Sequence, residues 1–112
     1  MEPHFTTERN VMAKLIAVHQ QPKDSAAFDH YYFNTLVPLA KTIPGLVSCE
    51  VTSGDVIGMA GEHGIYRVAI LEFESMATIG ADMASPQGQV AADFGNFASA
   101  AADVMMGDTK MV

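Results

Sequence analysis

Three stretches of the chain have the spacing of apolar side chains that is typical of β-strands. Residues 11–18, "VMAKLIAV", and residues 65–75, "IYRVAILEFES", carry apolar side chains on both of their alternating faces. A strand of that kind is covered on both sides in the folded protein. Residues 46–54, "LVSCEVTSG", instead alternate between apolar and polar side chains. The pattern therefore predicts three strands, of which the first and the third are buried on both faces.

Between the first two strands, apolar side chains recur at helical spacing. Asp24 or Ser25 offers an N-cap, and "IPG" at residues 43–45 ends the helix because proline cannot continue it. One apolar stripe runs between these two ends and consists of Phe28, Tyr32, Leu36 (or Thr35), Leu39 and Ile43. The stripe predicts a helix that packs on the sheet through this face.

The rest of the chain predicts a short helix over 75–85, a break at "SPQG", a second helix from about 87 to 102, and a fourth strand in "DVMMGDTKMV". The order β-α-β-β-α-β is that of ferredoxin-like α+β folds. Two helices cover one face of the sheet, and a second copy of the sheet is the economical cover for the other. We therefore expect one domain over residues 1–112 that forms a homodimer through its sheet face.

Composition narrows the choice of partners. The 112 residues are 49% hydrophobic and 17% charged, and the net charge is −7. Six Lys and Arg residues in all argue against nucleic acid and against anionic membrane surfaces. Cys49 is the single cysteine, so an internal disulfide is excluded. The chain has no apolar run of about 20 residues and no signal-peptide pattern at its start, so a cytoplasmic location is expected.

The run "FDHYYFNTLVPLAKTIPGL", residues 28–46, resembles the first-helix signature of EthD-type proteins, roughly Phe-x-x-Tyr-Tyr-x-x-x-His-x-Pro-Leu followed by Pro-Gly. The later "SPQGQVAADFGNF", residues 85–97, is similar to the second signature, a Ser-Pro break before an Asp-x-x-x-Phe helix. With the element order, the resemblance extends from about residue 11 to residue 112. It implies a dimeric α+β barrel, in which two sheets pack face to face, and an association with the degradation of ethers and other xenobiotics.

Relatives on this barrel include cofactor-free monooxygenases, cyclases, isomerases and haem-binding proteins, and the fold does not decide among them. The resemblance implies a small cofactor-independent protein of catabolic, xenobiotic or secondary metabolism that acts on a hydrophobic small molecule. Two alternatives remain, a binding protein without activity and a cyclase or monooxygenase-type enzyme. Leu36 stands where the family pattern has its helix histidine, and leucine transfers no proton. The resemblance implies no cofactor, and tight haem binding is not expected because haem-degrading relatives use a helix histidine where this chain has Leu36.

Three polar side chains are candidates for catalysis. Tyr32 lies on the apolar stripe and so points towards the sheet, where its phenol needs a partner. His19 ends the first strand with the same parity as Leu15 and could take over proton transfer. Asp93 flanks the buried face of the second helix. The expected ligand-binding side chains are apolar and comprise Phe28, Leu36, Leu39 and Phe94.

Each candidate also has a purely structural interpretation. Tyr32 packs the core equally well, His19 is a partly exposed turn residue, and Asp93 lies on a helix surface. The strand cations Lys14 and Arg67 are expected to pair across the sheet, with Glu50, Glu72 or Glu74. No His, Asp or Glu spacing matches a zinc or iron site, so no metal is expected.

Overall fold

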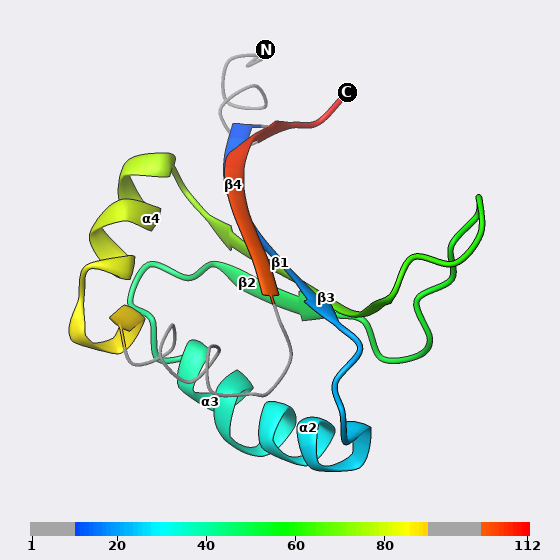
Figure 1. The fold of residues 1–112 in the computed structure, drawn as a ribbon. Coiled ribbons are helices and arrows are strands. Elements are labelled where there is room, and N and C mark those ends of the chain that lie inside the picture. The colour runs from blue at the N-terminus through cyan, green and yellow to red at the C-terminus, as the bar shows by residue number, and fades with distance from the viewer. Residues whose placement is uncertain (1–10, 90–101) are drawn as a thin grey trace.

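The structure is a computed structural model that describes residues 11–89 and 102–112. Its four strands form one antiparallel sheet in the order β2-β3-β1-β4 (Figure 1). The strand bounds are β1 Val11–Gln20, β2 Ser48–Val51, β3 Ile65–Phe73 and β4 Ala102–Lys110. The order confirms the predicted ferredoxin-like α+β arrangement.

The helices cover one face of this sheet (Figure 1). Three segments follow one another without a break: α2 Ser25–Tyr31, the π-helix η1 Tyr32–Leu36 and α3 Val37–Ala40; α4 Met76–Met83 follows β3. As predicted, a new helical turn begins after Ser85, whose hydroxyl accepts a hydrogen bond from the Gly88 N–H at 3.1 Å. Most of the predicted second helix falls within residues 90–101, outside the described residues. No helix in the described part is long and apolar enough to cross a membrane.

The wide turn η1 has a cause in the sequence. Pro38 has no N–H, and in an α-helix its ring would collide with the carbonyl of Asn34, four residues earlier. In η1 the Val37 N–H bonds instead to the Tyr32 carbonyl, five residues back. The wider turn thus lets the helix continue through Pro38. Single π turns of this kind are frequent at functional sites.

The core lies between the sheet and the helices. Its fully buried side chains include Phe73 of β3 and Ile79 of α4. A buried carboxylate fixes the neighbouring loop, since Asp82 of α4 accepts a hydrogen bond from the Gly45 N–H at 2.8 Å. This bond ties the turn after α3 to α4 and closes that end of the helical layer.

The other face of the sheet has no described helix over it (Figure 1). Its centre is apolar, with Ile16 and Val18 of β1 beside Val68 and Ile70 of β3. All four side chains are only half-buried in the single chain. Both faces of the two central strands are therefore apolar, as the sequence pattern predicted, but the described helices cover only one of them.

The Asp82–Gly45 contact leads to a test of stability. A Cβ on Gly45 would collide with the Asp82 carboxylate and the Thr78 side chain. Gly45→Ala should therefore lower the free energy of unfolding by about 1–3 kcal/mol, as overpacking does. Urea denaturation measures this change, at one protein concentration for all variants, because the stability of a protein that self-associates depends on its concentration.

Gly80→Ala is the matched control. A Cβ on Gly80 meets nothing within 4 Å on the exposed side of α4. This variant should be more stable by about 0.5–1 kcal/mol, because alanine favours the helix. Equal stability of the two variants would contradict the packing described for the turn after α3.

Candidate functional site

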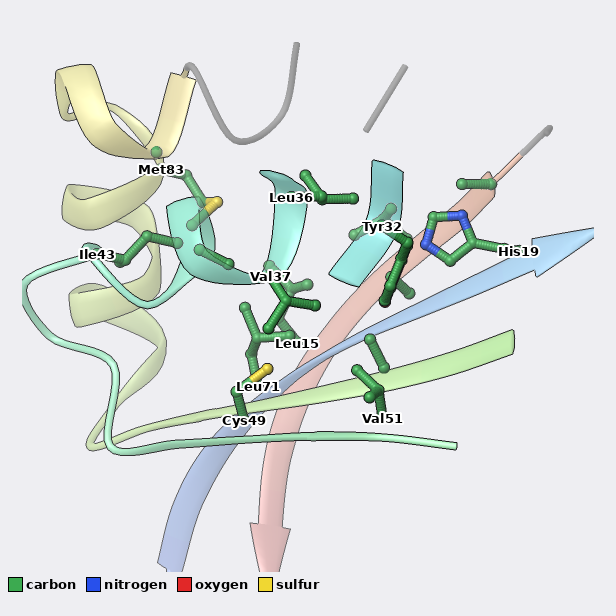
Figure 2. A pocket seen from close by; sticks show the side chains of 16 residues that line it. Leu15, His19, Tyr32, Leu36, Val37, Ile43, Cys49, Val51, Leu71 and Met83 are labelled. Carbon is green, nitrogen blue, oxygen red and sulfur yellow. The ribbon is translucent and has the colours of Figure 1, made fainter. Parts of the chain in front are cut away.

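A cavity of about 310 Å³ lies between the helix-covered face of the sheet and the helices (Figure 2). Its volume is within the range of small-molecule pockets. The part of the wall that the structure describes is apolar except for His19, Tyr32 and the thiol of Cys49. Sixteen of the described residues line it: Leu15, Ala17, His19, Tyr32, Leu36, Val37, Ala40, Ile43, Cys49, Val51, Ala69, Leu71, Met83, Gly88, Ala102 and Val104.

The wide turn η1 decides which helix residues face the cavity. Leu36 lines it, as the stripe predicted, but the extra residue of the π turn shifts the phase of the helix after that point. Val37 and Ala40 consequently continue the cavity wall. Leu39, which the unbroken α-helical spacing placed on the stripe, is half-buried and does not line the cavity. The expected contact of Leu39 with a ligand therefore finds no support in the cavity wall.

His19 and Tyr32 form the polar end of the cavity. Their side chains are 4% and 3% exposed, and their rings meet edge to face with centroids 5.3 Å apart. Phe28 stacks on Tyr32 at 5.4 Å and touches His19 edge-on at 5.6 Å. Phe28 does not line the cavity itself. It therefore supports the two polar rings, where the sequence suggested contact with a ligand.

An ion pair lies next to this end. Arg67 of β3 is directly opposite His19 of β1, and its Nη2 donates to Asp29 Oδ1 of α2 at 2.7 Å. The predicted pairing of Arg67 with a glutamate across the sheet is therefore wrong. The reason is parity: Arg67 lies on the helix-covered face, whereas Glu50 and Glu72 lie on the other. Lys14 likewise donates to Thr109 Oγ1, at 3.0 Å, rather than to a glutamate.

A β-bulge adds a tyrosine to the same cluster. His19 pairs with Arg67, but Gln20 pairs with Ile65, so Tyr66 has no opposite residue in β1. A bulge redirects the side chain of its extra residue. Here the Tyr66 hydroxyl donates to Asp29 Oδ2 at 2.8 Å. Both carboxylate oxygens of Asp29 are thus engaged.

Four aromatic rings surround the Arg67 guanidinium. Its Cζ lies 4.6 Å from the ring centroid of Phe33, 5.1 Å from those of Tyr32 and Tyr66, and 6.0 Å from that of Phe28. Arginine is suited to such a place because its planar group stacks on aromatic faces while it remains charged. The rings hold the cation behind the cavity wall, which Arg67 does not join.

Burial and charge set the protonation states at this end. Burial, with the neighbouring Arg67 charge, lowers the pKa of His19 below its ordinary 6.5. Burial raises the pKa of Tyr32 to about 12, a rise that Cys49 increases and Arg67 opposes. Burial also raises the pKa of the Cys49 thiol. At neutral pH the cavity therefore presents a neutral imidazole, a protonated phenol and a protonated thiol.

The structure brings together only part of the predicted site. Tyr32, His19 and Leu36 meet at the cavity, whereas Asp93 and Phe94 lie outside the described residues. Within the part that is described, no three His, Cys, Asp or Glu side chains are grouped as a metal site requires. Sequence reasoning missed the Asp29–Arg67–Tyr66 cluster. The sequence did contain one indication. Arg67 alternates along β3 with Ala69 and Leu71, so it lies on the same face of the sheet as these cavity residues.

Comparison with known proteins identifies the family. No family model matches the sequence. The chain is 36% identical over 102 residues to an uncharacterized 11.0 kDa protein in the thcB-thcC intergenic region of Rhodococcus erythropolis, a match that covers 90% of this chain and 98% of that protein. It is also 34% identical to an ethyl tert-butyl ether d (EthD) family protein from Bacillus halodurans, with a TM-score of 0.77, over 86% of this chain and 96% of that one. The chain belongs to the EthD family.

The fold of this EthD-family chain also occurs in more distant proteins. A dimeric protein of ferredoxin-like fold from Bacteroides fragilis matches with a TM-score of 0.61 at 13% identity, over 89% of this chain and 96% of that one. At that identity the likeness concerns the fold alone. The two EthD-type signatures and the two closer relatives together carry the assignment to the family.

The buried His19 predicts a pH dependence of stability. Its pKa in the folded protein lies below the unfolded value of 6.5, so below that pH the unfolded chain takes up a proton that the folded chain does not. The free energy of unfolding therefore falls as the pH is lowered from 6.5 towards the pKa of His19 in the folded protein. The loss is at most about 1.4 kcal/mol per pH unit. His19→Phe, which keeps a ring beside Phe28 and Tyr32, should remove this part of the loss.

Urea denaturation between about pH 8 and about pH 5 measures the difference between wild type and variant, and carboxylates common to both cancel in it. His30→Gln, at an exposed position on α2, serves as the control and should keep the wild-type dependence. A His19→Phe curve parallel to that of the wild type would show that His19 protonates as easily in the folded chain as in the unfolded one.

Proposed function

We propose that this EthD-family protein binds a hydrophobic small molecule in the cavity and acts on it through the hydrogen-bonding groups of His19 and Tyr32. The observation that carries the proposal is the composition of the cavity wall. It is apolar along its length and places two buried polar rings at one end. A pocket of this kind binds by apolar contact and orients its ligand through a few polar groups.

Catalysis without a cofactor is the form of activity that the site supports. The Tyr32 phenol stays protonated at neutral pH and is able to donate to a reacting oxygen. His19 is neutral and lies within ring contact of Tyr32. Metabolism of xenobiotic or secondary compounds, in the cytoplasm, is the setting that fits an apolar ligand. Neither nucleic acid nor a membrane is among the proposed partners.

A homodimer through the bare sheet face is part of the proposal. The half-buried centre of that face, Ile16, Val18, Val68 and Ile70, gains a cover when a second sheet packs on it. The Bacteroides neighbour of the same fold is described as dimeric, which supports this arrangement. Each chain would then keep its own cavity on the face away from the interface.

A binding protein without turnover is the second candidate. Leu36 lines the cavity at the position where the EthD-type signature has a histidine. Its side chain adds apolar contact and removes one proton-transfer group. This favours retention of a ligand by shape over its conversion.

Incubation with an organic extract of the host cells, followed by mass spectrometry, separates the two candidates. For an enzyme, wild type should consume a compound that Tyr32→Phe binds but leaves unchanged, because only the hydroxyl is lost. For a binding protein, both should retain the same compound unaltered. The measured quantities are the amount consumed in solution and the amount carried by the repurified protein.

Two further variants show whether the cavity is involved. Ala17→Phe places a ring in the cavity and should abolish retention and consumption alike. Ala77→Phe, at an exposed position on α4, should behave as the wild type. If the ligand still binds to Ala17→Phe, the cavity is not the binding site and the proposal fails.

Sedimentation at micromolar concentration tests the dimer. The expected mass is twice that of the 12.0 kDa chain. Ile16→Lys places a charge at the centre of the bare face and should shift the protein towards monomer, because a buried unpaired charge is costly. Ala77→Lys, on the outer side of α4, should remain dimeric. A monomeric wild type would refute pairing through the sheet.

A further inference from the structure

The two ring nitrogens of His19 lie in different surroundings. Nδ1 is sealed from solvent and has no hydrogen-bond partner among the described residues. The other nitrogen, Nε2, is on the side of the ring that points towards Tyr32 and the cavity (Figure 2). Only Nε2 is therefore placed to meet a bound molecule.

These surroundings decide where the single proton of the neutral imidazole resides. A proton on Nδ1 would be a buried N–H donor without an acceptor, a state that proteins rarely tolerate. A proton on Nε2 points towards the cavity, where a ligand or water is able to accept it. Arg67, directly across the strand pair, opposes a second proton on the ring. His19 thus offers an N–H donor to the cavity.

Tyr32, whose ring centroid lies 5.3 Å from that of His19 and which also lines the cavity, carries a second donor. Its hydroxyl stays protonated and forms no hydrogen bond within the part of the chain that the structure describes. The Cys49 thiol, also protonated, is at most a weak donor. Among the described residues no charged group joins the wall, because the Arg67 cation is paired with Asp29 behind it. The polar end, as the described residues form it, is uncharged and consists of donors.

We propose that His19 Nε2–H and Tyr32 Oη–H both donate to one carbonyl oxygen of an uncharged, otherwise apolar molecule. A carbonyl oxygen accepts two hydrogen bonds and brings no donor that would lack a partner. A carboxylate would lose its hydration without gaining a free cation, and an ammonium group would meet no free anion. Two such donors also polarise a carbonyl towards reaction, as neutral imidazoles do in other enzymes. The inference rests on the proposed function, since it requires a ligand in the cavity.

Three naphthalenes of matched size test the choice of chemistry: 2-acetylnaphthalene, a ketone; 2-ethylnaphthalene, which has no oxygen; and 2-naphthoate, a carboxylate. Titration of the full-length wild type should give the tightest binding for the ketone, about fivefold tighter than for the hydrocarbon. The carboxylate should bind most weakly. His19→Phe and Tyr32→Phe should each lower the affinity for the ketone by about fivefold. The affinity of each variant for the hydrocarbon should stay within about twofold of that of the wild type.

Two spectroscopic measurements on the wild type avoid any loss of fold in the variants. The stretching band of a ¹³C-labelled carbonyl should move to lower wavenumber on binding than in hexane, because two donors weaken the bond. The ¹⁵N spectrum of His19 at neutral pH should show the proton on Nε2. A proton on Nδ1, or a band at its hexane position, overturns the inference.

The outcomes separate this inference from the proposed function. If the wild type binds the ketone and the hydrocarbon with equal affinity, and neither His19→Phe nor Tyr32→Phe changes this, carbonyl recognition is overturned. The apolar cavity then remains a binding site. Tightest binding of the carboxylate would also overturn carbonyl recognition. Failure of all three naphthalenes to bind would count against both proposals.

Discussion

The ion pair between Arg67 and Asp29 is the contact on which the polar end of the cavity depends. The arginine side chain is 8% exposed and that of Asp29 40%, so the pair bridges from the interior to the edge of the molecule. A guanidinium at that depth without a partner would cost several kcal/mol. Helix α2 is therefore held in the rotation that brings Asp29 over β3. The same rotation places Phe28 and Tyr32 against His19, so one electrostatic requirement orients two aromatic rings.

Pro38 imposes a second constraint along the same helix. Because its ring excludes a regular α-helical turn, η1 widens, and residues after Leu36 reach the sheet in a different phase. Val37 and Ala40, which are smaller than Leu39, then line the cavity. Small side chains at these positions leave space that a continuous α-helical stripe of large residues would fill. The cavity thus follows partly from one backbone irregularity.

Much of the fold was predictable, because it rests on local patterns. Apolar positions on both faces predicted β1 and β3, and Asp24, one of the two N-caps considered, precedes α2. The helix stripe correctly placed Tyr32 and Leu36 towards the sheet. It failed at Leu39, because the prediction assumes the same rotation per residue along the whole helix and the π turn changes that rotation. A bulge is equally invisible to strand periodicity, so the side chain of Tyr66 could not be placed. The partner of Arg67 depends on which face of the sheet α2 covers. That is a property of the tertiary structure and cannot be read from local sequence patterns.

The position of the polar groups bears on how this chain could act without the helix histidine of its family signature. Leu36 occupies that place here. The imidazole near the cavity is instead that of His19, close to the end of β1, where it lies opposite Arg67 of the antiparallel strand β3. Strand β1 is hydrogen-bonded to β3 on one side and to β4 on the other, and precise sites favour such regular elements over loops. The neighbouring cation also gives His19 a different task. A histidine held neutral beside a buried arginine is poorly suited to store a proton and well suited to donate a hydrogen bond. Leucine at one position of the helix and the charge at one position of the sheet thus both favour the proposed site, in which an uncharged ligand is oriented and polarised.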